Sequence, residues 1–137
     1  MLFRSAARKK IAEGVVLYKD ECYAIQGAIY EVYRMMDCGF LEAVYQECLE
    51  KELTLRNIPF QSQSSVNLMY KVERLLQTYK PDLICYEKII LEIMAVKDVG
   101  EEQYAQVFNY LKATGLCLGL LVNFGHSPKA TIKRIVP

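Results

Sequence analysis

The spacing of apolar residues predicts two amphipathic helices in the first half of the chain. Over residues 20–36, apolar positions recur at steps of three and four residues, which is the period of a helix with one buried face. The predicted inward positions of this helix are Cys22, Ile25, Ile29, Val32, Tyr33 and Met36. A second helix is predicted over residues 40–56, ended by Asn57 and Pro59. Its predicted inward positions are Leu41, Val44, Tyr45, Cys48, Leu49 and Leu53.

After residue 59 the pattern becomes typical of strands. Alternation between residues 60 and 79 predicts two strands, and residues 82–86 and 89–96 are apolar on both faces, as strands covered on both sides are. Asp98 and Glu101 have the spacing of a capping box for a helix over residues 101–114, and Gly115 ends that helix. Residues 116–124 and 131–136 are again predicted to be extended.

The order of these elements predicts the fold class. Two helices, three or four strands, a helix and a strand describe a small α/β sandwich with a mixed sheet. A length of 137 residues corresponds to one domain, of which we expect residues 1–19 to be a peripheral segment. The chain is 53% hydrophobic and 24% charged, which excludes a disordered or fibrous polymer.

Charge and cysteine content narrow the classes of partner. Lys and Arg number 17 against 16 for Asp and Glu, so any nucleic acid must be recognised by a local site. Five cysteines without a C-x-x-C pair, and the single histidine His126, disfavour a zinc site. Each cysteine has apolar neighbours and is expected to be a small core residue in a reducing compartment. The basic residues 1–10 lack the features of a secretion signal, and no apolar run approaches the ~18 residues of a membrane span, so a cytoplasmic protein is expected.

Glu92 is the least expected residue in the sequence, because it interrupts the apolar run of residues 89–93. An unpaired buried charge is costly and requires a cation, a metal ion or a shifted pKa. Asp82 lies an even number of residues away, so an odd loop such as residues 86–88 would bring both carboxylates to one face of the sheet, whereas a two-residue turn would separate them. Two adjacent carboxylates favour a divalent cation such as Mg²⁺. The alternative is a structural Glu92 paired with Lys80, Lys97 or Arg74.

Three polar residues on the predicted helices are further candidates. Glu42 falls on the flank of the buried stripe of the second helix, away from water, and its alternative role is that of a capping-box residue at the helix start. Gln106 and Tyr110 are one turn apart on the same side of the third helix. A tyrosine in such a position is more often a core residue, so these two gain meaning only beside the acids.

Residues 39–45, with the sequence GFLEAVY, resemble the motif that gives the GxxExxY proteins their name, a branch of the PD-(D/E)XK nuclease superfamily. The segments YKPDL at 79–83, LEIMAV at 91–96, AQVFNYL at 105–111 and GLCLGLLVNF at 115–124 resemble the same family in order and spacing, so the resemblance covers about residues 20–136. It implies a restriction-endonuclease-like αβββαβ core with a mixed sheet flanked by helices.

The resemblance also implies a RecB-like site for Mg²⁺ or Mn²⁺. Glu42, Asp82, Glu92 and the main-chain carbonyl of Ile93 would hold the ion. Gln106 and Tyr110 correspond to the element that lies beside the nucleic-acid phosphate.

Met94 departs from the family pattern, because it stands where the motif E-x-K has its catalytic lysine. Met94 points to the Glu92 side of the strand but supplies no charge and no proton. Loss of such a group typically costs ~10²–10⁴-fold in rate. Lys80, Lys88 or Lys97 could take the place of the missing lysine. A second departure is Val72, which replaces a frequent turn glycine and predicts a wider or shifted turn.

Two functions follow as hypotheses. The first is a metal-dependent nuclease impaired by Met94, with DNA favoured over RNA as substrate. The alternative is an inactive module of the nuclease fold that binds nucleic acid or a protein partner. A local basic patch is predicted from Arg74, Lys80, Lys129, Lys133 and Arg134. Analogy with the superfamily suggests a homodimer, and no membrane association is expected.

Overall fold

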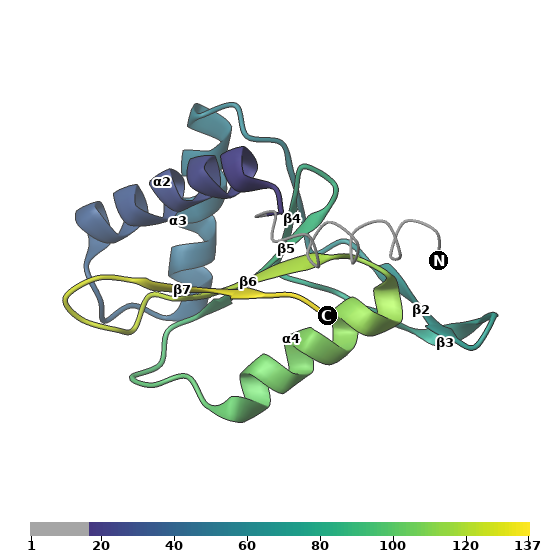
Figure 1. Ribbon diagram of the computed structural model, residues 1–137. Coiled ribbons are helices and arrows are strands. Elements are labelled where there is room, and N and C mark those ends of the chain that lie inside the picture. Colours follow the sequence, from purple (N-terminus) through teal and green to yellow (C-terminus); the bar gives the residue numbers. More distant parts are fainter. Residues whose placement is uncertain (1–16) are drawn as a thin grey trace.

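The computed structural model describes residues 17–137 and has three helices and seven strands in that range (Figure 1). The elements are α2 (Lys19–Met36), α3 (Glu42–Leu55), β1 (Phe60–Ser62), β2 (Val66–Tyr70), β3 (Glu73–Tyr79), β4 (Leu83–Cys85), β5 (Ile89–Met94), α4 (Glu101–Thr114), β6 (Leu118–Asn123) and β7 (Thr131–Ile135). The three helices lie where the sequence predicts them, and five strands precede α4 where three or four are predicted. The basic segment 1–10 lies outside the described residues.

Five strands form one mixed sheet in the order β1-β4-β5-β6-β7. The pair β5–β6 is parallel, and the other neighbouring pairs are antiparallel. The strands β2 and β3 form a separate hairpin, which projects from the body of the molecule (Figure 1). The predicted α/β class with a mixed sheet flanked by helices is therefore confirmed. Within residues 17–137, no helix has the length and apolar character needed to cross a membrane.

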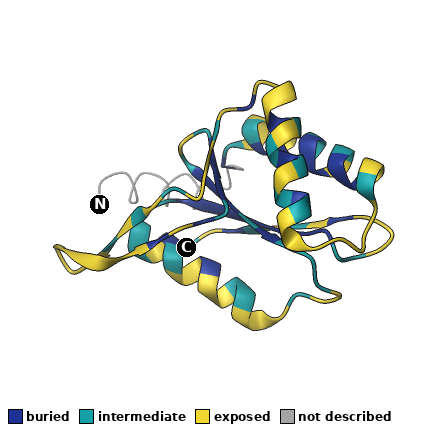
Figure 2. Cartoon of the chain, turned by 180° about the vertical axis from the view of Figure 1, so that it is seen from behind, coloured by how far each residue is buried: buried dark blue, intermediate teal, exposed yellow. Residues whose placement is uncertain are grey.

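The sheet separates two layers of helix. The pair α2 and α3 covers one face, and α4 covers the other (Figure 1). Along β5, Ile89, Leu91 and Ile93 pack in the core with α2 and α3, whereas Ile90 and Met94 pack with α4. This alternation follows from the two-residue period of a strand. Figure 2 shows the central strands as the most deeply buried part of the chain. Burying each such side chain fully contributes roughly 1.5–3 kcal/mol.

Gly119 allows α4 to lie close to the sheet. A Cβ atom at this position would come within 2.8 Å of Val107 Cγ1 and 3.5 Å of Leu111 Cδ1, both on α4. Real Cβ atoms essentially never come as close as 2.8 Å to another atom, so any larger residue would push α4 outward. The distance between α4 and β6 therefore depends on this glycine.

Asn123 joins the carboxyl ends of β5 and β6. It is 2% exposed, and its Oδ1 accepts from the N–H groups of Val96 and Gly125 at 3.0 Å each. Its Nδ2 donates to the Val96 carbonyl at 2.8 Å. A buried amide with all these partners satisfied fixes the chain that follows Met94. This end of β5 carries Glu92, which is considered below.

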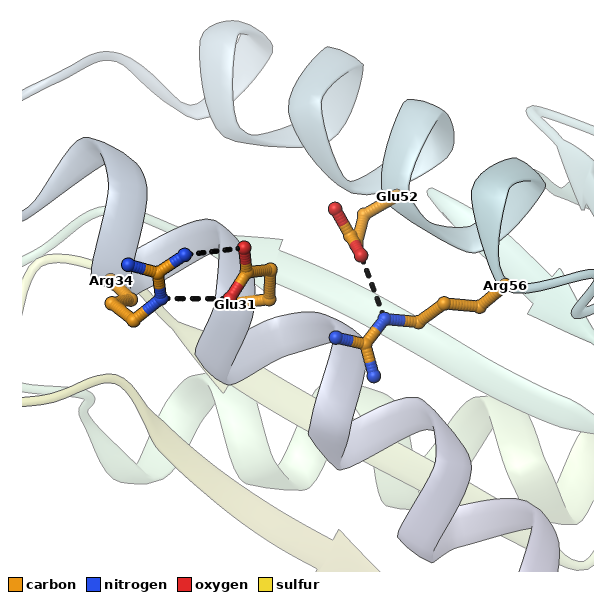
Figure 3. A network of polar contacts seen from close by, with 4 residues as sticks. All are labelled: Glu31, Arg34, Glu52 and Arg56. Atoms are coloured by element: carbon orange, nitrogen blue, oxygen red, sulfur yellow. Dashed lines mark hydrogen bonds and ion pairs between the residues drawn. The ribbon is translucent and has the colours of Figure 1, made fainter.

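Surface ion pairs accompany the packing of α2 against α3 (Figure 3). Arg34 pairs with Glu31 on α2, and Arg56 at the end of α3 pairs with Glu52 at 2.7 Å. The guanidinium of Arg56 also lies over Gly27 of α2, with Nη1 2.9 Å from where a Cβ would be. Exposed pairs of this kind typically contribute only about 0–1 kcal/mol. The buried stripe between the helices is therefore the main source of their stability.

Several predictions at the ends of elements are wrong. Leu41 is 79% exposed, because it is the N-cap of α3 and stands in extended conformation before the helical face begins. Cys38 is exposed in the loop between α2 and α3, whereas Cys48, within α3, is partly buried and packs against the core as predicted. Asp98 caps no helix, since α4 starts from Gly100 without a side-chain cap.

Of the two outcomes predicted for the hairpin turn, a wider loop is wrong. Tyr70 pairs with Glu73, so the loop is only two residues long and not wider. The left-handed residue is Lys71, with φ 54°, which spares the β-branched Val72 that conformation.

Candidate active site

A three-residue loop sets the register of the two strands that carry the acids. Residues 86–88 join β4 to β5, and both Tyr86 and Glu87 have positive φ. In the antiparallel register of β4 and β5, Cys85 lies opposite Ile89 and Leu83 lies opposite Leu91. The next residues on each side, Asp82 and Glu92, therefore also lie opposite each other. The prediction that an odd loop brings the two acids to one face is confirmed, because both line the same cavity.

This cavity has a volume of about 250 Å³ and lies between the start of α3, the strands β4 and β5, and α4. Its lining residues are Glu42, Tyr79, Asp82, Glu92, Ile93, Met94, Gln103, Gln106, Val107 and Leu121. The structure thus brings together every predicted site residue except Tyr110. Tyr110 is not in the cavity wall, because its ring stacks on Tyr79.

Asp82 is held by the backbone of the neighbouring strand. Its Oδ2 accepts from the N–H of Ile93 at 2.7 Å. Burial raises the pKa of Asp82 above its usual range, and the hydrogen bond from Ile93 opposes that rise. Asp82 is therefore oriented in the fold but poorly compensated as an anion.

Of the two acids Asp82 and Glu92, Glu92 has the larger electrostatic cost of carrying a negative charge in the folded chain. Burial above all, together with the charges of Asp82 and Glu42, raises the pKa of this carboxyl from 4.5 to a net value of about 7. Hydrogen bonds from the Tyr79 hydroxyl and the Asp82 backbone act in the opposite direction. None of the ion pairs within residues 17–137 involves Glu92. The alternative in which Glu92 pairs with Lys80, Lys97 or Arg74 is therefore wrong, and its partner is Tyr79.

Glu42 is the first residue of α3 and stands at the mouth of the cavity. The residue is exposed, so the prediction that it avoids water is wrong. The reason is that the first turn of α3 extends past the packed part of the helix. Burial raises the pKa of Glu42 most, and the charge of Asp82 raises it further. It makes no capping hydrogen bond at the start of α3, so its capping-box alternative is not observed.

No cationic side chain lines the cavity. Lys88 is engaged elsewhere, since its Nζ lies 2.6 Å from Glu21 Oε2 and above the ring of Tyr18. Lys80 and Lys97 are exposed and do not line the cavity. Met94 occupies the Glu92 side of β5 as predicted. In this structure, none of the three predicted substitutes takes the lysine's place.

Sequence reasoning missed two polar residues of the cavity wall. Tyr79 is 8% exposed and contacts Glu92 through its hydroxyl. Gln103 lies one helical turn before Gln106, and its Oε1 is the buried side-chain oxygen without a hydrogen-bond partner within residues 17–137. The i, i+3 spacing from Gln106 could have indicated Gln103. The position of Tyr79 at the start of the YKPD segment gave a weaker signal.

The donor set of this cavity fits a divalent cation in chemical type. Carboxylate, amide and main-chain oxygens are the ligands that Mg²⁺ prefers, and three acids with raised pKa values gain from a positive charge. Within residues 17–137, however, no three His, Cys, Asp or Glu side chains are gathered closely enough to hold an ion as they stand. The assembled part is the pair of Asp82 and Glu92, and Glu42 would have to turn toward it.

The sheet between two helical layers, with an acidic pair at its centre, defines a restriction-endonuclease-like fold. The sequence pattern of the PD-(D/E)XK nuclease superfamily matches residues 19–135, and the chain belongs to this superfamily. The crystal structure of SSO0001 shares the fold, with a TM-score of 0.53 and 17% sequence identity over 69% of this chain. The match covers 48% of that protein, so the chain spans about half its length. No curated protein sequence matches the chain.

Proposed function

We propose that the protein is a metal-dependent nuclease that hydrolyses phosphodiester bonds, with DNA favoured over RNA. The observation that carries this proposal is the pair of Asp82 and Glu92, which share one cavity without any cationic side chain in its wall. A partly buried acid pair with raised pKa values is costly to the fold, and a bound cation would offset that cost. The motifs listed above favour the GxxExxY branch and a RecB-like arrangement of this site.

Each residue of the cavity has a role in this proposal. Asp82, Glu92 and the carbonyl of Ile93 would hold Mg²⁺ or Mn²⁺, and Glu42 would complete the set. When bound, such an ion polarises the scissile phosphate and lowers the pKa of a bound water. The amides of Gln103 and Gln106 can donate to the non-bridging phosphate oxygens. Tyr79 keeps Glu92 in place through its hydroxyl.

Met94 limits the rate in this proposal. A lysine at this position would add a positive charge beside Glu92, where negative charge develops on the phosphate. The thioether of Met94 cannot do so. We expect slow cleavage, lower by ~10²–10⁴-fold than that of a lysine-bearing site.

The second candidate function is a non-catalytic module that binds nucleic acid or a protein partner. Met94 favours it, together with the absence of Lys, Arg and His from the cavity wall. The predicted basic patch is weakened, because Arg134 donates to the Leu17 carbonyl and to Cys22 Sγ. A homodimer is proposed only by analogy with the superfamily.

A nuclease assay of the parent beside Met94→Lys, with Mg²⁺ and with Mn²⁺, separates the two functions. Met and Lys have similar unbranched stems, so packing should change little. We expect Met94→Lys to cleave faster by ~10²-fold or more. The matched control is Met35→Lys, which adds the same charge on α2 at a position that is 66% exposed and does not line the cavity. If Met94→Lys is folded, binds Mn²⁺ and cleaves no faster than the control, the binding module replaces the nuclease.

A further inference from the structure

We propose that Tyr79 is a positioning residue that holds the Glu92 carboxylate for cation binding, and that Tyr110 acts through Tyr79 and not on the substrate directly. This inference rests on the proposed function, because it concerns the same site. It assigns roles to a tyrosine that the motifs leave without one and to a tyrosine whose expected place is beside the phosphate.

The contact between Tyr79 and Glu92 is direct. The Tyr79 hydroxyl donates to Glu92 Oε1, and Tyr79 is the only residue in the cavity wall that carries a hydroxyl. A carboxylate has about four acceptor positions, so this bond leaves others for a cation. Hydrogen bonding to the charged form also opposes the cost of burying Glu92.

The ring of Tyr79 has little freedom to move. It ends β3 opposite Val66 and is 8% exposed in the core formed with Ile90, Val107 and Leu111. Tyr110, one turn after Gln106 on α4, stacks on it with ring centroids 3.8 Å apart and an angle of 2° between the planes. The phenol is thus held by the core and by the stacked ring of Tyr110, and its hydroxyl direction is set by the fold.

Fixing Glu92 matters because the site has no lysine to do it. A glutamate has three side-chain torsions, and in this cavity its neighbours on the same strand face include the neutral Met94. Repulsion from Asp82 would turn an untethered Glu92 away from the pair. Partners that orient metal-binding carboxylates are typically worth ~10–100-fold in metal affinity or activity.

Calorimetric titration with Mn²⁺ of the parent and Tyr79→Phe tests the proposal. This change removes the hydroxyl and keeps the ring that stacks on Tyr110. We expect the affinity for Mn²⁺ to fall ~10–100-fold. The matched control is Tyr33→Phe, since Tyr33 is also 8% exposed and its hydroxyl donates to the His126 carbonyl, away from the cavity. Thermal unfolding in EDTA should show similar losses of stability for both variants.

Tyr110→Leu tests the second half of the proposal. It leaves the Tyr79 hydroxyl but removes its support, so we expect a smaller loss of Mn²⁺ affinity than in Tyr79→Phe and no additional loss in the double variant. If Tyr110→Leu weakens nucleic-acid binding while Mn²⁺ affinity is unchanged, Tyr110 contacts the substrate. The proposal that it acts through Tyr79 is then wrong.

The two possible failures are distinguishable. Equal affinities for the parent, Tyr79→Phe and Tyr33→Phe would overturn the role of Tyr79 and leave the metal site intact. A parent that binds no Mn²⁺ would overturn the proposed function, and the positioning role with it.

Discussion

Glu92 carries its carboxyl group within the apolar strand β5, where an acid is unusual. Its carboxyl is largely withdrawn from water, has two acidic neighbours and receives its hydrogen bonds from Tyr79 and the Asp82 backbone. Burial of this kind favours the neutral form, which explains why its pKa lies near neutrality. The position was visible in the sequence as one acid within an apolar run. Its partner was not, because Tyr79 is 13 residues earlier and reaches Glu92 only in the folded chain.

The stability of the metal-free protein should therefore depend on pH through Glu92. Below pH 4.5 this group is protonated in both the folded and the unfolded chain. Between pH 4.5 and about 7 the unfolded chain loses the proton while the folded chain keeps it, so the free energy of unfolding falls as pH rises. The shift from 4.5 to about 7 corresponds to a loss on the order of 3 kcal/mol.

Urea unfolding of the parent and Glu92→Gln in EDTA, from pH 4.5 to 8, measures this dependence. The difference in stability between the two proteins should change across that window in favour of Glu92→Gln. A constant difference would show that Glu92 ionises normally in the folded chain.

At the residue scale, the sequence identified the acids better than their surroundings. Asp82 and Glu92 could be paired because strand parity and loop length alone decide which face a side chain occupies. Gln103 and Tyr79 could not be given roles, since these depend on how α4 packs across the sheet. The exposure of Glu42 was also not predictable from the angular position of its side chain around the helix axis. That angle takes no account of where the packed part of α3 begins.

At the scale of elements, interior patterns were informative and ends were not. The helices α2 and α3 and the buried strands follow directly from apolar spacing, because that spacing reflects burial along the whole element. The capping box at Asp98 failed because the N-cap position of α4 is Gly100, two residues later. The separation of β2 and β3 from the main sheet was not predicted, since strand pairing is not encoded in the alternation of a single strand.

Gly119→Ala should move α4 and disturb the site. The added Cβ would meet Val107 Cγ1 at 2.8 Å, and a valine in a helix has few alternative rotamers. We expect a destabilisation of about 1–3 kcal/mol. A weaker affinity for Mn²⁺ should accompany it, because α4 carries Gln103 and the support for Tyr79.

Gly27→Ala is the matched control. Its Cβ would meet only the flexible end of Arg56, and alanine in a helix is favoured over glycine by roughly 0.5–1 kcal/mol. Thermal unfolding should therefore show opposite signs for the two glycine variants. Equal losses would mean that the close approach of α4 is not what Gly119 provides.

At the scale of the whole molecule, the candidate site joins parts that are far apart in the sequence. Glu42 comes from the start of α3, Asp82 and Glu92 from the central hairpin, and Gln103 from α4. These elements belong to two different core clusters on opposite faces of the sheet. A ligand that binds at their junction should therefore stabilise the entire fold and not one element.

Mn²⁺ should raise the thermal stability of the parent as a consequence. An ion that binds only the folded chain adds about 2.7 kcal/mol at a concentration one hundred times its Kd. For a chain of this size the melting temperature should then rise by several degrees. The rise should be larger at pH 8 than at pH 5.5, because protons compete for Glu92 below its pKa of about 7.

Two variants make this measurement specific to the acid pair. Asp82→Asn should lose most of the rise, since it removes one of the two assembled carboxylates. Met94→Lys should retain a smaller rise than the parent, because its ammonium repels the ion while the same charge assists cleavage. EDTA should reverse every shift. A rise in Asp82→Asn equal to that of the parent would place the bound ion elsewhere on the molecule and remove the physical basis of the nuclease proposal.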